Sequence, residues 1–586
     1  MNRTWNTSYQ LTADITLLGR KLHACKKVLA LSAVTFSMLA TSAEAASVHR
    51  SKSPIKDSSG RVEVIVDFDF DPDTDTEFDE FIDDAEYKKW TGHRPKAIKF
   101  LAKFQKKYGV ERSGMTSWTT TSMTAYVTSA QLDSITRDKR VVLVTENEPQ
   151  RYSSFFVAPD LIVSGSTGES SSWGWALTTN MTPLPAGTSE RLVYVIDSGI
   201  ANHVDLNVYK RTNVACGTGA ENCSDGTSTD QFPEVGCYPH ATHVAGIIGA
   251  KYGNATTNIG VYAGVKLVSV GVQAASAPNL GICAASPFEV PDRTPTISTI
   301  GYALDWVRKS TLLRVQTLGD TRVPIVSMSI NSGRLGYGVA SDNSIVAETN
   351  RAKLLSMVNP AQSVCSPIGY WENKGCALVD YPGAFFVQSA GNQTAAGGGF
   401  AGAGRNVCTQ FTDGIAGNSG PSLAYTHAYP NGGTTSPSDG VMVIGAIRQV
   451  GAVADTAPVS TPFSDTAPAS LTTSPTSSNY GACIDAWAPG DRIYSTYCQQ
   501  YPGSPNAQSC VVGTSYSGNG TSGTQGWAFL SGTSMAAPHV AGAAAYLADS
   551  LSLTTPASIE QALRMRLYAT GYTDRGGNAV KVVQVP

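Results

Sequence analysis

Charged side chains are scarce in this 586-residue chain: they make up 15% of it, against about 25% in an average domain. The 43 Lys and Arg nearly balance the 46 Asp and Glu, so the net charge is only −3. Proteins that bind nucleic acid or an anionic membrane surface usually carry a basic excess, which this sequence lacks. We therefore expect no nucleic acid among its partners.

Several metal-binding patterns are missing too. The cysteines form no C-x-x-C pair matched by a second Cys or His pair, which argues against structural zinc. The acidic run that starts at Asp71 begins like a calcium loop, but Thr76 and Ile82 stand where an EF-hand needs Gly and Glu. A solvated acidic loop is the better interpretation.

Long apolar runs are absent beyond the N-terminal region. There, residues 28–40 form an apolar run that follows three lysines and precedes the small-x-small sequence Ala43-Glu44-Ala45. This order is typical of an export signal, and the run is too short to span a bilayer comfortably; a buried helix is the alternative. We expect a signal peptide over 1–45, no membrane span, and a secreted protein, extracellular or periplasmic.

Ten of the 11 cysteines follow residue 45, and an even number in an exported protein indicates disulfides. Short separations favour three local pairs, Cys216–Cys223, Cys365–Cys376 and Cys498–Cys510. The other four cysteines would pair over longer range, in a connectivity that the sequence leaves open.

The segment after the signal has the pattern of a small α+β unit. Polar, Gly- and Ser-rich sequence over 147–172 then indicates an exposed, cleavable linker. The unit is either a prodomain or a separate binding module. Its expected elements are strands at 62–68, 123–127 and 141–144 and helices at 94–108 and 129–137.

Downstream, two buried strands end in polar residues. The apolar stretch 192–196 fits a strand covered on both faces of a parallel sheet, and it runs into Asp197, which either orients an imidazole or caps a turn. The stretch 385–389 likewise leads to Asn392, whose amide either donates to an oxyanion or makes a turn.

Two further residues stand at expected helix starts. His240 opens a helix of small residues and could act as a general base, or with His243 as a metal ligand, although no H-E-x-x-H pattern is present. Ser534 precedes the alanine-rich run 541–551, so it lies in the field of unpaired helix N–H groups. The alternative for Ser534 is a simple N-cap.

Together the motifs VYVIDSGI, HATHVAGIIGA, FFVQSAGN and LSGTSMAAPHVAG, in this order, closely resemble the subtilisin-like serine proteases (subtilases). The resemblance implies an α/β fold, a mainly parallel sheet flanked by helices, over 166–586. It also implies that 46–165 holds a small α+β inhibitory propeptide and its linker, so the prodomain alternative is favoured.

By the same resemblance, Ser534 is the nucleophile, His240 the general base, Asp197 its orienting carboxylate and Asn392 an oxyanion donor. The implied activity is peptide-bond hydrolysis through an acyl-enzyme, by a self-processed zymogen. The chemistry requires no cofactor, although structural calcium is common in the family. The implied substrate-binding residues are Ser329, Ile330, Asn331, Ser389, Ala390 and Gly391.

We expect a monomer whose partners are protein or peptide substrates and its own propeptide. Two other classes remain as alternatives. An esterase would favour a G-x-S-x-G elbow and the order Ser, acid, His, whereas the order here is Asp, His, Ser. A catalytically silent binding protein would have lost a member of the triad, and none is lost.

Overall fold

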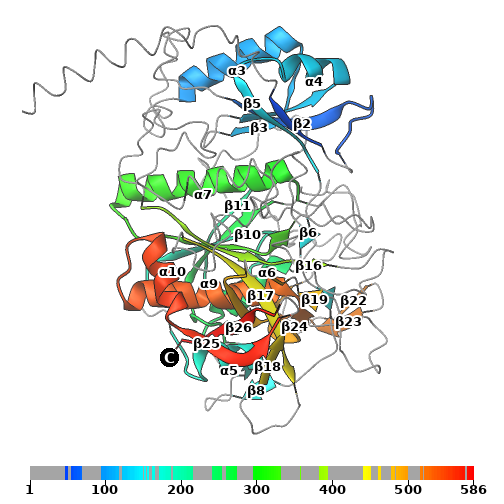
Figure 1. Ribbon diagram of the computed structural model, residues 1–586. Coiled ribbons are helices and arrows are strands. Elements are labelled where there is room, and N and C mark those ends of the chain that lie inside the picture. Colours follow the sequence, from blue (N-terminus) through cyan, green and yellow to red (C-terminus); the bar gives the residue numbers. More distant parts are fainter. Residues whose placement is uncertain are drawn as a thin grey trace, which may run out of the picture.

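The computed structural model describes a large part of the chain (Figure 1). It covers residues 46–50, 54–68, 94–117, 122–148, 151–152, 155–156, 162–164, 170–185, 189–214, 240–253, 259–272, 295–331, 357, 382–393, 440–450, 459–462, 477–478, 480–481, 484–498, 515–518, 521–524, 526–574 and 577–585. The signal segment and the acidic run lie outside these ranges. No helix within them is long and apolar enough to cross a membrane.

The N-terminal part is a five-stranded sheet in the order β1-β5-β2-β4-β3 with two helices on it, at the top of Figure 1. The three strands and two helices predicted here are confirmed, while β1 and β3 were not predicted because neither has an apolar alternation. The bounds are β1 Ser47–His49, β2 Val62–Phe68, β3 Arg112–Ser117, β4 Ser122–Val127, β5 Val141–Glu146, α3 Arg94–Tyr108 and α4 Ser129–Ile135.

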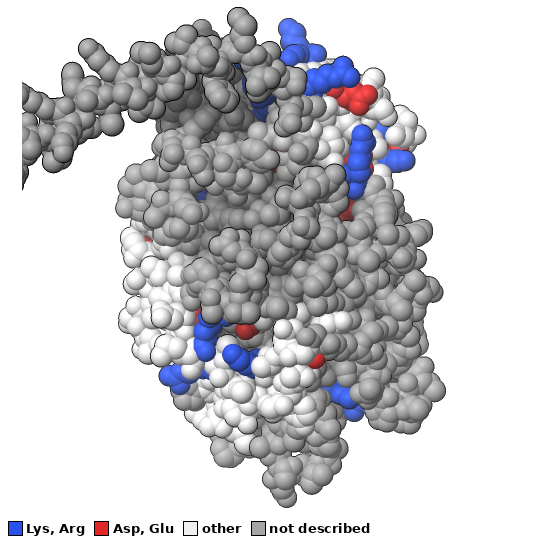
Figure 2. Space-filling model, viewed as in Figure 1, with Lys and Arg blue, Asp and Glu red and all other residues white. Residues whose placement is uncertain are grey.

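An aromatic cluster holds α3 on this sheet. The Phe68 ring of β2 meets Phe100 and Phe104 edge-on, with centroids 5.0 and 4.7 Å apart. Lys103, Lys106 and Lys107 of α3 are exposed, and Figure 2 shows Lys and Arg side chains over this upper domain. The helix ends where Gly109 adopts a left-handed φ of 61°.

The main part is a ten-stranded sheet in the order β11-β12-β10-β13-β15-β17-β20-β26-β25, with β18 beside β17. All neighbours on this path are parallel except β25 and β26. Its strands are β10 Leu192–Asp197, β11 Val208–Asn213, β12 Lys266–Gly271, β13 Ile325–Met328, β15 Phe385–Ser389, β17 Val441–Val450, β18 Val459–Pro462, β20 Ala486–Pro489, β25 Leu567–Thr573 and β26 Ala579–Val583.

Helices cover both faces of this sheet, as Figure 1 shows. Side chains of β10 alternate between the two layers: Val193 and Val195 join the core under one set of helices, and Tyr194 joins the core under α7. This confirms the predicted α/β class. The helices are α7 Ile297–Leu318 on one face and α5 Trp173–Thr179, α6 His240–Gly249, α9 Thr533–Ser550 and α10 Pro556–Arg564 on the other.

Short strands complete the described structure. They form small antiparallel ladders around the main sheet. Their bounds are β6 Arg151–Tyr152, β7 Phe155–Phe156, β8 Ile162–Ser164, β9 Ser170–Ser172, β14 Ile330–Asn331, β16 Asn392–Gln393, β19 Ser477–Ser478, β21 Ile493–Tyr497, β22 Ser515–Gly518, β23 Thr521–Thr524 and β24 Gly526–Ser531.

The N-terminal sheet rests on α7, and the contact corrects one prediction. The expected exposed linker starts at Asn147, yet Asn147 is fully buried. Its amide oxygen accepts from the Ser298 N–H at 3.2 Å, and the Glu148 carbonyl accepts from the Ile297 N–H at 3.2 Å. Residues 147–148 are buried because they satisfy two of the N–H groups that the first turn of α7 leaves unpaired.

Of the predicted disulfide partners, the described residues include only Cys498, which is buried beside Ala201. The other cysteines lie outside the described ranges.

Candidate active site

The carboxyl ends of three adjacent parallel strands bring the predicted residues to one edge of the sheet. Asp197 ends β10, Ser329 follows β13 directly, and Ser389 ends β15. Since these strands are neighbours in the order β10-β13-β15, the three residues lie side by side at the edge where open α/β sheets hold their ligands. The helices that begin with His240 and Thr533 pack against each other over this region.

Asp197 and His240 form a direct contact. The Nδ1 atom of His240 lies 2.8 Å from Oδ1 and 2.9 Å from Oδ2 of Asp197. Asp197 is fully buried and His240 is 5% exposed. An ionised carboxylate accepts hydrogen bonds only, so Nδ1 donates and Nε2 becomes the proton-accepting nitrogen of the neutral ring.

Ser198 holds this pair in place, and sequence reasoning missed it. Its backbone N–H donates to Asp197 Oδ1 at 2.6 Å, while its hydroxyl accepts from the Ala241 N–H at 3.1 Å. Ser198 thus caps the first turn of α6 from the end of β10. Only its position next to Asp197 could have indicated this role from the sequence. The residue that it caps, Ala241, lies 43 positions away.

Ser534 is the second residue of α9 and is fully buried. Gly532, with φ 144°, is the residue that precedes the helix, so the alternative that Ser534 is an N-cap is wrong. The Ser534 hydroxyl donates to the Ser329 carbonyl at 3.0 Å, and the Ser329 hydroxyl donates to the Ser534 carbonyl at 3.0 Å. These bonds tie the start of α9 to the end of β13.

The segment that leads to Asn392 is also tied to α9. The Gly391 N–H donates to the hydroxyl of Thr533, the residue before Ser534, at 3.0 Å. Ser389 and Ala390 are fully buried beside this contact. The backbone of Asn392 pairs with Ser478 in a short ladder, and its side chain lies outside what the structure describes.

The remaining predicted residues form an edge next to Ser329. Ile330 and Asn331 make up β14, which pairs antiparallel with β6: Ile330 faces Tyr152 and Asn331 faces Arg151. The side chain of Ile330 is buried, and that of Asn331 lies outside the described part. The strand β14 therefore accepts an extended segment of chain alongside it.

His243, the alternative metal ligand, serves the core instead. Its Nε2 lies 3.0 Å from the carbonyls of both Ile493 and Ala528. Burial lowers the pKa of this imidazole to about 3. His243 is therefore a neutral ring that donates to two carbonyls. Among the residues that the structure describes, no group of three His, Cys, Asp or Glu is suited to hold a metal ion.

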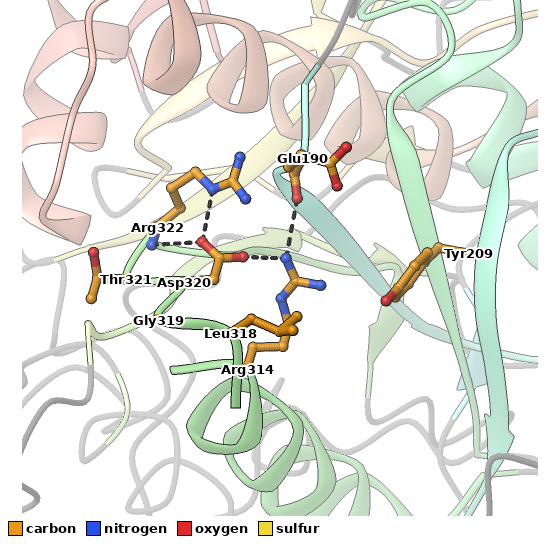
Figure 3. A pocket seen from close by; sticks show the side chains of 8 residues that line it. All are labelled: Glu190, Tyr209, Arg314, Leu318, Gly319, Asp320, Thr321 and Arg322. Carbon is orange, nitrogen blue, oxygen red and sulfur yellow. Dashed lines mark hydrogen bonds and ion pairs between the residues drawn. The ribbon is translucent and has the colours of Figure 1, made fainter. Parts of the chain in front are cut away.

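An open pocket lies at the opposite edge of the sheet (Figure 3), between the C-terminus of α7 and the residues that precede β10 and β13. Three of its charged groups pair with one another: Asp320 accepts from the Arg322 Nε at 2.7 Å and also from Arg314. Burial alone would raise the pKa of Asp320, but these hydrogen bonds lower it to about 2. The pocket sits at the amino ends of the strands, away from the candidate site.

Comparison with known proteins supports the predicted resemblance to the subtilases. The model of the Subtilase family matches residues 188–582. The chain is 39% identical over 87 residues to Subtilisin-like protease 2 of Trichophyton equinum, which is 15% of each chain. It is 36% identical over 107 residues to the cuticle-degrading protease of Metarhizium anisopliae, which is 18% of this chain and 21% of that one.

These matched segments span 21% or less of the relatives' own lengths. Among solved structures, fervidolysin from Fervidobacterium pennivorans, described as a keratinolytic enzyme related to subtilisin, matches with a TM-score of 0.48 and 16% identity, over 94% of this chain and 64% of that one. The family match covers well over half of the sequence, including Asp197, His240 and Ser534. The chain therefore belongs to the subtilase family.

Proposed function

We propose that this subtilase is a secreted serine endopeptidase, made as a zymogen, that hydrolyses peptide bonds through an acyl-enzyme. The observation that carries the proposal is the contact between the buried Asp197 carboxylate and His240 Nδ1, with the helix that bears Ser534 packed against the helix that His240 opens.

In this proposal Ser534 attacks the substrate carbonyl while His240 Nε2 takes its proton. The imidazolium so formed is stabilised by Asp197, and it later gives the proton to the leaving amine. Water then hydrolyses the ester and restores the serine. The reaction needs no cofactor, and calcium, if bound, would serve stability.

The oxyanion that forms on the substrate carbonyl needs donors. The start of α9 supplies the N–H groups and positive dipole end around Ser534, and the side chain of Asn392 is the proposed second donor. The link between Gly391 and Thr533 supports this role, because it ties the segment before Asn392 to the residue before Ser534.

The zymogen proposal draws on the contact between the N-terminal sheet and α7. Besides the two bonds from 147–148, the hydroxyls of Thr124 and Tyr302 lie 2.5 Å apart in a buried site, and Ile65 packs on Ile297. A separate binding module would not be expected to satisfy the first turn of a helix in its neighbour. We propose that 46–165 is the propeptide and linker, that the propeptide inhibits, and that the processed enzyme is a monomer.

The substrates we propose are proteins and peptides bound as an extended strand along β14, with Ser329, Ile330, Asn331 and the segment Ser389 to Gly391 lining the cleft. Neither segment contains an acidic residue, which favours apolar or broad side-chain preference.

Casein hydrolysis by the purified chain tests the proposal, with chain size followed on a gel. The Ser534→Ala variant should neither cleave casein nor shed its N-terminal part. Ser550→Ala, at the far end of the same helix, is the matched control and should behave like the parent. A folded parent, freed of its N-terminal part, that is as inert as Ser534→Ala would refute the protease assignment and favour a binding protein on this fold.

A further inference from the structure

The pocket in Figure 3 combines charged and apolar groups at the amino ends of the strands. Its volume is about 370 Å³, which lies at the small end of the range for ligand pockets, about 300–1,000 Å³. Two large hydrophobic side chains in its lining are open to solvent: Tyr209 is 52% exposed and Leu318 is 66% exposed. A pocket of this size suits one small ligand or a single residue of a peptide.

Positive charge is in excess around the pocket. Arg314 and Arg322 share the one carboxylate of Asp320. Glu190, the other acidic residue of the lining, is paired with Lys266. One positive charge therefore has no counterion in this group of residues, and an anion in the pocket would supply it.

Both arginines keep N–H groups that are not used in these pairs. Arg314 donates from one terminal nitrogen to Asp320 and to the Glu190 carbonyl, and Arg322 donates from its Nε atom. In Figure 3 the other terminal nitrogen of Arg314 points toward the Tyr209 hydroxyl, and the Arg314 Cζ atom lies 5.8 Å from the centroid of that ring. Guanidinium N–H groups arranged as a fork match the two oxygens of a carboxylate.

We propose that this pocket binds the C-terminal residue of a peptide whose last side chain is apolar. The carboxylate bridges Arg314 and Arg322 and supplies the missing negative charge. The apolar side chain covers Tyr209 and Leu318, which are otherwise open to water. The site lies at the opposite edge of the sheet from Ser534 and is separate from the candidate active site.

Glu190 distinguishes a peptide from a simple fatty acid. Lys266 pairs with its Oε2 atom, and Oε1 has no partner among the residues that the structure describes. This oxygen can accept an N–H, which the last residue of a peptide carries beside its carboxylate and a fatty acid lacks. The inference does not rest on the protease proposal, although peptide hydrolysis would be one source of such C-termini.

Ligand-observed NMR titrations of the full-length Ser534→Ala protein test the assignment, with N-acetyl-leucine as the probe. Three related compounds each lack one feature: N-acetyl-leucinamide has no carboxylate, acetate has no apolar group and hexanoate has no N–H. We expect N-acetyl-leucine to bind at least about tenfold more tightly than each of them. Equal binding of any one of the three overturns the inference.

Substitutions in the pocket show where the probe binds. Arg322→Leu leaves Asp320 paired with Arg314 and should weaken binding of N-acetyl-leucine at least about tenfold. Leu318→Ser should weaken it at least about threefold, and this exposed position tolerates the change even if Arg322→Leu does not fold. The matched control is Arg566→Leu, an exposed arginine beside β25 at the far end of the strand order, which should bind like the parent.

Binding that is unchanged in Leu318→Ser, or in a folded Arg322→Leu variant, overturns the inference, because the probe would then occupy another site. Failure of the protease proposal is a separate result, since it is read from casein hydrolysis and the binding titrations use a protein without the Ser534 hydroxyl.

Discussion

Ser329 and Ser534 exchange two hydrogen bonds, each hydroxyl donating to the other residue's carbonyl at 3.0 Å. In a helix, the Ser534 carbonyl would normally accept a hydrogen bond from the N–H four residues later. That residue is Pro538, which has no N–H to donate. Ser329 supplies the missing donor from a neighbouring strand. A proline is thereby tolerated in the helix that carries Ser534.

This relationship predicts an interaction between two substitutions. In a Ser534→Ala background, chosen because the proposed protease could not then cut itself, Ser329→Ala should lower the free energy of unfolding by about 1–3 kcal/mol, because a buried carbonyl loses its donor. In the same background with Pro538→Ala, the new N–H can take over, and the loss should shrink below about 1 kcal/mol. Denaturant unfolding of the four proteins measures the difference, and equal losses in both backgrounds would contradict this account.

Asp197 sets the tautomer of His240, which predicts a large effect from a nearly isosteric change. Asp197→Asn can present its amide N–H groups to Nδ1 and so favour the wrong tautomer. We expect processing of the full-length chain to slow by roughly 10⁴. Gel time courses measure this rate, with Asp133→Asn on the exposed side of α4 as the control that should process normally. A slowing of less than tenfold would show that the carboxylate does not orient the base.

The buried contact between Thr124 and Tyr302 predicts how tightly the N-terminal domain, which we propose is a propeptide, is held on α7. Removing one hydroxyl, as in Tyr302→Phe, leaves the other buried without its partner and should weaken retention of this domain by about 1–3 kcal/mol. Activity should then appear earlier after the first cut. Adding Thr124→Val removes both hydroxyls and should restore part of the delay. A double variant that is as fast as the sum of the two single effects would contradict a direct bond.

Much of the fold could be predicted from the sequence because its signals are local. Five apolar residues from Leu192 identify a strand buried on both faces, and the spacing of Leu101, Phe104 and Tyr108 identifies the inward face of α3. Contacts between distant segments leave no such signal. Asn147 sits in polar sequence and is buried only because the start of α7 offers it unpaired N–H groups.

The residues of the candidate site also divide into those that local sequence indicates and those that depend on distant contacts. Asp197, His240 and Ser534 each stand at a strand or helix boundary that the sequence indicates. Ser198 and the donor role of Ser329 could not be predicted, since each depends on a partner that only the folded sheet brings near. The helix α9 begins at Thr533, earlier than the predicted start at residue 541. The sequence around Pro538 does not show that the Ser329 hydroxyl replaces the N–H that this proline lacks.

Buried histidines predict how stability changes with pH. Burial lowers the pKa of His243 to about 3 and that of His539 to about 4, whereas in the unfolded chain both titrate near 6.5. Between these pKa values the unfolded chain binds more protons than the folded protein. The histidines' contribution to the free energy of unfolding is therefore complete above about pH 6.5 and is lost as the pH falls toward the folded pKa values. Each histidine adds up to about 1.4 kcal/mol per pH unit.

Replacing one of the two rings measures its share. In the Ser534→Ala background, His243→Gln keeps a donor for the carbonyls of Ile493 and Ala528 but does not titrate. Unfolding free energies of the two proteins should run parallel above pH 7, and the variant's acid slope should be shallower by about one proton between pH 6 and 4. Identical slopes throughout would mean that His243 is not held neutral by the fold.

The C-terminal helix depends on one arginine that serves two buried carboxylates. Arg564 lies 2.6 Å from an oxygen of Asp485 and 2.6 Å from an oxygen of Glu560. The side chains of both acids are 1% exposed or less. Their other oxygens accept backbone N–H groups of β17 and the residue before it, from Val443 at 2.8 Å and from Gly440 at 2.7 Å. Arg564 therefore joins α10 to the main sheet.

Arg564→Met should lower the free energy of unfolding by about 3–5 kcal/mol, because it leaves two carboxylates buried without their cation. The exposed Arg566, two residues further on, provides the matched control: Arg566→Met should change stability by less than about 0.5 kcal/mol. Adding Glu560→Gln to Arg564→Met removes one of the stranded charges and should recover part of the loss. Thermal or denaturant unfolding in the Ser534→Ala background gives these values, and a small loss for Arg564→Met would show that the acids are held neutral without it.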